Sequence, residues 1–140
     1  MGRIIKTESA GKDRTRLSKE IVLAIRELMK QNHPDEATKD LTAFIALSLE
    51  QIAQTIDLSV VAWEKRGYWV KADRFRLEWS WAGKQAELMR QATIQQDWGQ
   101  VGQVAIQVAQ KLSSIKIAEH HRLGTPWIGS WNKFAVLKKN

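Results

Sequence analysis

The chain has 140 residues, of which 44% are hydrophobic and 26% charged, an ordinary balance for one globular domain with one core. It contains no cysteine, which excludes a disulfide framework, a thiolate metal site and a cysteine nucleophile. The net charge of +7 comes from the two ends of the chain: residues 1–19 hold six Lys or Arg against two acidic residues, and residues 111–140 hold six against one. Such ends favour a polyanionic partner, and nucleic acid is the commonest polyanion in a cytosol.

The first residues lack the apolar stretch of a signal peptide, and no apolar run approaches the ~18 residues that cross a bilayer. We therefore expect a cytoplasmic protein with no membrane partner. Residues 1–16 show no sustained hydrophobic period and are predicted to be a basic arm. A helical domain is predicted to follow over residues 17–117.

The first helix of this domain is predicted from about Leu17 to Gln31. It ends before Pro34, because proline disfavours helical geometry in the residue that precedes it. The second helix is predicted over about residues 36–65, and Asp35 is its expected N-cap.

Gly67 is suited to the left-handed conformation that commonly ends a helix, so a turn is predicted there. A third helix over about residues 68–95 then returns alongside the second, and a fourth extends from about residue 98 to residue 114. Four helices with short connections indicate an all-α, antiparallel four-helix bundle.

The third helix carries two apolar stripes. Steps of four and three residues connect Tyr68, Ala72, Phe75, Trp79, Ala82, Ala86, Met89 and Thr93. Leu77, Trp81 and Leu88 fall roughly opposite that face, at about 100° per residue. A helix with two apolar sides lies between two layers or buries one side on a partner. These three residues are therefore the predicted contacts for a protein partner or a homodimer.

Residues 118–140 contain Pro126 and two glycines and are predicted to form an extended C-terminal tail. Its apolar residues, chiefly Trp127, Trp131 and Phe134, are possible anchors. In one interpretation the two tryptophans fold back and cover Leu77, Trp81 and Leu88. In the other, they accompany the basic residues of the tail in binding a ligand.

The first candidate site is the basic and aromatic cluster around the predicted turn. Its members are Lys65, Arg66, Trp69, Lys71, Arg74 and Arg76. Lys and Arg contact phosphates, and Trp69, which lies off the main stripe, offers a face on which an unpaired base can stack. The alternative is a solvated helix face on which Arg74 pairs with Glu78, four residues further on.

The second candidate site is in the tail, where basic and aromatic residues alternate without a helical period. Its charged candidates are His120, His121, Arg122 and Lys133. This pattern suits a single strand or an RNA backbone.

Metal and catalytic sites are not indicated. Adjacent residues of an extended chain point in opposite directions, so His120 and His121 are poorly placed to share one metal. No zinc motif and no nucleophile motif completes a site, and we expect no cofactor and no enzymatic activity. The sequence favours non-enzymatic binding of RNA or single-stranded DNA, with little sequence preference, by an accessory subunit. The alternative is a protein–protein adaptor or structural subunit without nucleic-acid contact.

Overall fold

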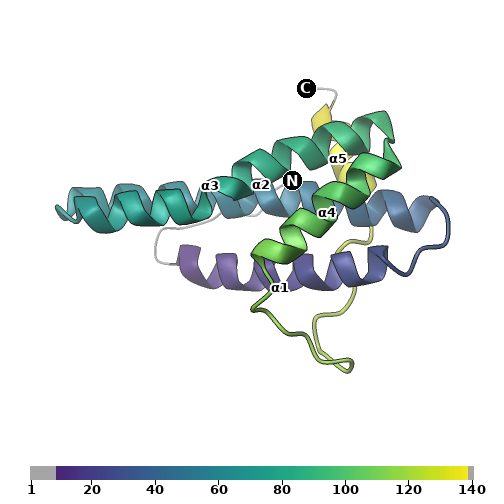
Figure 1. Cartoon of the computed structure of the whole chain (residues 1–140), viewed down its shortest axis with the longest axis horizontal. Helices are drawn as coiled ribbons and strands as arrows, with labels where there is room; N and C mark the ends of the chain where they lie inside the picture. The colour runs from purple at the N-terminus through teal and green to yellow at the C-terminus, as the bar shows by residue number, and fades with distance from the viewer. Residues whose placement is uncertain (1–8, 139–140) are drawn as a thin grey trace.

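The computed structural model describes residues 9–138, and this part of the chain is all-helical, which confirms the predicted class. Its elements are α1 (Ala10–Leu28), α2 (Glu36–Lys65), α3 (Trp69–Gln95), α4 (Trp98–Lys111) and α5 (Ser130–Lys138). Figure 1 shows α2 and α3 as the long axis of the molecule, with α1 and α4 beside them.

Helix α2 is the central element, because α1, α3 and α5 each pack against it. Asp35 caps it as predicted: its carboxylate accepts a hydrogen bond from the Thr38 backbone N–H over 3.0 Å. Of the described helices, only α2 is long and apolar enough to span a membrane. In this fold several of its apolar side chains, among them Ile45, Leu49 and Ile52, are fully buried against the surrounding helices.

Helices α2 and α3 form a hairpin whose turn is at Gly67, in the left-handed conformation with φ of 81°. The backbone N–H groups of Gly67 and Tyr68 close the end of α2 by bonding the carbonyls of Glu64 and Trp63. Next to the turn the two helices are in contact, because the rings of Trp63 of α2 and Phe75 of α3 lie edge to face with their centres 4.8 Å apart. In Figure 1 this turn projects well past the end of α1 and past α4, so the tip of the hairpin stands clear of the other helices.

Helix α1 begins at Ala10, inside the segment that was predicted to be an arm. Ala10 is fully buried, and the next inward residue, Arg14, lies over the ring of Phe75 at 4.7 Å. The prediction was wrong for residues 10–16. The first turns of α1 pack against the hairpin through an alanine and an arginine, and a search for large apolar residues does not detect such a contact. Residues 1–8 of the predicted arm lie outside the described residues.

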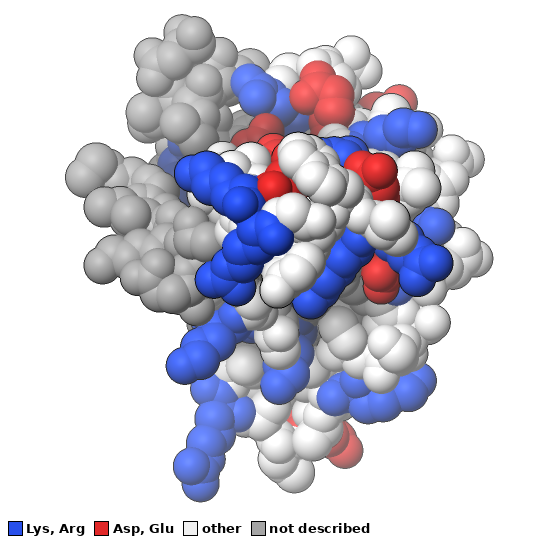
Figure 2. Space-filling view, turned by 90° about the vertical axis from the view of Figure 1, so that its left-hand side faces the viewer, with Lys and Arg blue, Asp and Glu red and all other residues white. Residues whose placement is uncertain are grey.

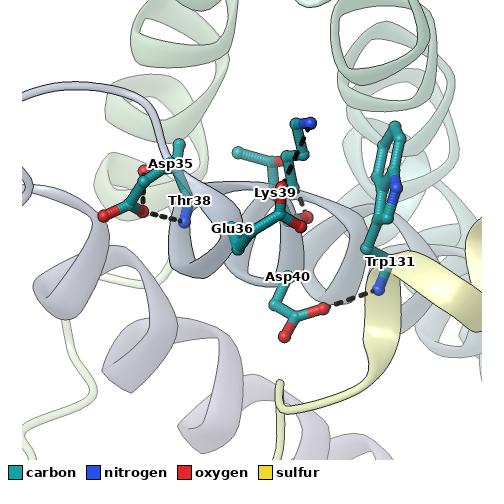
Figure 3. A network of polar contacts seen from close by, with 7 residues as sticks. Asp35, Glu36, Thr38, Lys39, Asp40 and Trp131 are labelled. Atoms are coloured by element: carbon teal, nitrogen blue, oxygen red, sulfur yellow. Dashed lines mark hydrogen bonds and ion pairs between the residues drawn. The ribbon is translucent and has the colours of Figure 1, made fainter.

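The C-terminal segment is not extended throughout, because its last part forms α5. Asp40 of α2 accepts hydrogen bonds from the backbone N–H groups of Trp131 (2.9 Å) and Gly129 (3.2 Å), and the first of these is drawn in Figure 3. The cap of α5 therefore comes from another helix, which a local pattern cannot predict. Trp127 and Trp131 are half-buried and Phe134 is buried.

The tail thus folds back, but onto α2 rather than onto the second stripe of α3. Leu77 remains 76% exposed and Leu88 42% exposed, while Trp81 is half-buried against the core. The 112–129 loop, which joins α4 to α5, passes under α1 in Figure 1. Arg26 of α1 holds this loop by donating to the carbonyls of Ile117 (3.0 Å) and Ala118 (3.5 Å).

Candidate nucleic-acid interface

The projecting end of the α2–α3 hairpin carries all six residues of the first candidate site, called here the turn patch. They are Lys65, Arg66, Trp69, Lys71, Arg74 and Arg76. Trp69 is the first residue of α3 and is 59% exposed, between Tyr68 (53%) and Val70 (67%). Three consecutive exposed apolar or aromatic side chains at the tip of a helical hairpin have no function in the core of this chain.

Two cations of the turn patch already have partners. Arg76 forms ion pairs with Asp73 over 2.8 Å and with Glu64 over 3.0 Å, and the hydrogen bond to Glu64 raises the pKa of Arg76. The Nζ of Lys71 lies 4.5 Å from the centre of the Trp63 ring. These contacts fix the two side chains along the hairpin and reduce their availability to a ligand.

The other three cations, Lys65, Arg66 and Arg74, are exposed and make no ion pair or side-chain hydrogen bond with any described residue. The pair between Arg74 and Glu78 that their spacing allows is not formed. Contact of these side chains with a phosphate would therefore require no ion pair to break.

The tail candidates lie in two other places. His120 and Arg122 are exposed in the 112–129 loop. His121 is half-buried, and its Nδ1 accepts a hydrogen bond from the Leu123 backbone N–H over 3.1 Å, so this ring serves a local turn. Lys133 is exposed on α5, which is docked on α2 at Asp40. Since 25 residues of α2 separate Asp40 from Lys65, about 37 Å lies between that docking point and the turn patch.

The structure therefore brings the six turn residues together, leaves His120, His121 and Arg122 in the 112–129 loop, and places Lys133 at the opposite end of α2 from the turn. Within residues 9–138, no three His, Asp or Glu side chains come together in a way that could hold a metal ion. Comparisons of the chain with protein-family models, curated proteins and solved structures find no match.

A further basic surface was missed by the sequence analysis. It is an open groove of about 450 Å³ between α1 and the 112–129 loop, called here the α1 groove. Its lining residues are Gly11, Lys12, Thr15, Arg16, Lys19 and Leu123. The signal was present, because Lys12, Arg16 and Lys19 follow each other at steps of four and three and so share one side of a helix. It was overlooked because residues 1–16 were interpreted as an arm without helical structure.

Proposed function

We propose that this protein binds RNA or single-stranded DNA through the turn patch, as a non-enzymatic, cytoplasmic accessory subunit. The observation that carries the proposal is the exposed indole of Trp69 beside three cations, Lys65, Arg66 and Arg74, that have no ion-pair partner among residues 9–138. The fold that we propose for presenting this patch is an antiparallel bundle of α1 to α4, from one end of which the α2–α3 turn projects.

The proposed ligand is a single strand because stacking on an indole requires a base whose face is free. Stacking of this kind contributes about 1–3 kcal/mol per base, and it is tolerant of sequence because every base has such a face. Lysine and arginine supply the second part of the affinity through phosphates, which carry no sequence information. The combination favours binding with little sequence preference.

The test separates the two parts by their dependence on salt. Affinity for a single strand falls by roughly 0.7 log units per phosphate contact for each decade of salt concentration. Replacing Arg66 and Arg74 by Gln should therefore lower the slope by about 1.4. Trp69→Ala should instead weaken binding about tenfold or more and leave the slope nearly unchanged, because stacking releases few counterions. Anisotropy titrations at several salt concentrations measure both quantities.

Lys84→Gln is a matched control, since Lys84 is also exposed and unpaired on α3 but lies 15 residues from Trp69, about 22 Å along the helix. We expect it to change neither affinity nor slope beyond the small effect of net charge. Lack of binding by the wild-type chain to RNA and to single-stranded DNA at low salt would refute the proposal.

One observation favours the alternative function, that of a protein–protein adaptor. Leu77, on the second stripe of α3, is 76% exposed, the largest exposure among the large hydrophobic residues in the described part of the chain. A partner chain could cover it. Sedimentation of the wild-type chain and of Leu77→Lys/Leu88→Lys tests this alternative, because a complex that forms through this stripe should be lost in the double variant.

A further inference from the structure

The α1 groove has the construction of a phosphate-binding surface rather than of a pocket for a base. Three basic side chains, Lys12, Arg16 and Lys19, line it from α1, and Leu123 from the 112–129 loop closes it. No aromatic residue lines it, so it offers charge without a stacking platform. The hydrogen bonds that Arg26 of α1 donates to the 112–129 loop hold the loop beside the helix.

The cations of the groove differ in their availability. Arg16 pairs with Glu20 over 2.8 Å and with Asp13 over 3.6 Å, so its charge is largely compensated. Lys12 and Lys19 are exposed and make no ion pair or side-chain hydrogen bond with any described residue. The free positive charge of the groove thus comes from two lysines, which bind phosphate as point charges.

The α1 groove lies further along the helix axes than the turn patch. The contacts of Arg14 show how α1 is positioned along the hairpin. Its guanidinium lies 4.7 Å from the centre of the Phe75 ring and donates a hydrogen bond to Thr55 Oγ1 over 3.3 Å. Phe75 follows Trp69 by six residues and Lys19 follows Arg14 by five, which together place Lys19 about 17 Å beyond Trp69 along the helix axes.

The view from the side of the turn shows basic side chains over much of its height. In Figure 2, Lys and Arg side chains extend from the top of this face to its bottom, and they predominate over Asp and Glu in the lower half. That half of the view contains α1 and the 112–129 loop, which lie below the hairpin in Figure 1.

We infer that the α1 groove binds phosphates of the same single strand whose base stacks on Trp69. This inference rests on the proposed function and adds a minimum length for its ligand. At the ~3.4 Å per phosphate of a stacked strand, the span of about 17 Å from Trp69 to Lys19 corresponds to roughly five nucleotides, and an extended strand covers it with fewer. A strand of two nucleotides at Trp69 falls short of Lys19, whereas a strand of twelve reaches both surfaces.

The experiment compares oligothymidylates of two and twelve nucleotides, measured by anisotropy, with competition for the shorter one, over a range of salt concentrations. The groove variant Lys19→Gln should lower the salt slope of the longer strand by about 0.7, the value for one phosphate contact, and leave binding of the shorter strand unchanged. Lys19 is exposed and unpaired among the described residues, so we expect the same thermal unfolding curve as for the wild type.

The matched control is Lys84→Gln, which removes the same charge from α3, away from both surfaces. Its slope should equal that of the wild type for both strands. An unchanged slope of the longer strand in the groove variant, with binding of the shorter strand intact, would overturn the inference and leave the proposed function standing. If neither strand binds the wild type at low salt, the proposed function fails and the inference fails with it.

Discussion

At the scale of single residues, Arg14 shows how a charged side chain can serve as part of a core. Its guanidinium lies over Phe75 at 4.7 Å and over Trp79 at 5.9 Å, and it donates to Thr55. Burial lowers the pKa of Arg14, while the negative charge of Glu78 opposes that shift. One side chain therefore connects α1 to both helices of the hairpin.

We predict that Arg14→Gln destabilises the fold, because it removes the cation–π contacts and leaves a shorter side chain against the two rings. The loss should be about 1 kcal/mol, which lowers the midpoint of thermal unfolding by roughly 4 °C in a chain of this size. Circular dichroism during heating measures it. Lys12→Gln on the same helix removes the same charge from an exposed site and should leave the midpoint unchanged. Equal shifts in the two variants would show that net charge, not the contact, is responsible.

The residues of the turn patch were predictable, since Trp69 falls off the stripe that leads from Ala72 to Thr93 and a glycine marks the turn beside it. The ion pairs that these residues form were not predictable. Spacing alone allows Arg74 to pair with Glu78, yet it is Arg76 that pairs, and one of its partners is Glu64 of the preceding helix. Ion pairs across a turn depend on how two helices sit together, which a pattern along one helix does not contain.

At the scale of elements, α5 illustrates structure that comes from contacts distant in sequence. A helix of nine residues is marginal alone, because a first hydrogen-bonded turn is costly to form. Here Asp40 supplies acceptors to the N–H groups of Gly129 and Trp131, and the Nζ of Lys39 lies 5.6 Å from the Trp131 ring. Helices α2 to α4, in contrast, have continuous apolar stripes, and their predicted starts lie within one residue of the observed ones. Local periodicity was sufficient for those helices and insufficient for α5.

We predict that Asp40→Ala loosens α5 without unfolding the rest of the chain. Loss of an N-cap costs about 1 kcal/mol, so amide hydrogens of α5 should exchange roughly fivefold to tenfold faster. Amides in the middle of α2 and α3 should keep their rates. Hydrogen exchange followed by mass spectrometry measures both sets in one experiment.

Asp40→Asn is the informative companion, because asparagine retains one of the two oxygens that accept from Trp131 and Gly129 and replaces the other by an amide group that cannot accept. We expect its exchange rates in α5 to lie between those of the wild type and those of Asp40→Ala. If α5 exchanges at the wild-type rate in Asp40→Ala as well, the tail is held by Trp127, Trp131 and Phe134 rather than by the cap.

At the scale of the whole molecule, the core is centred on α2, and the exposed basic and apolar side chains are unevenly distributed over the surface. Basic side chains occupy the face seen from the projecting turn, and exposed apolar side chains occur on α3 at positions that the tail was predicted to cover. Leu77 and Leu88 are 11 residues apart, about 16 Å along the helix, and the exposed Lys84 stands between them. Isolated exposed leucines are common on monomeric proteins, whereas an interface requires a continuous apolar patch. The distribution favours a monomer that binds a polyanion.

We therefore predict that the wild-type chain sediments as a monomer and that Leu77→Lys/Leu88→Lys remains monomeric and fully helical. Leu77 is 76% exposed, so lysine there meets solvent instead of the core. Leu49→Lys, at a position with 0% exposure, should unfold the protein and so calibrates the circular dichroism signal. A wild-type dimer that the double variant splits into folded monomers would contradict the prediction. It would assign the second stripe of α3 to a second copy of this chain, as the adaptor alternative requires.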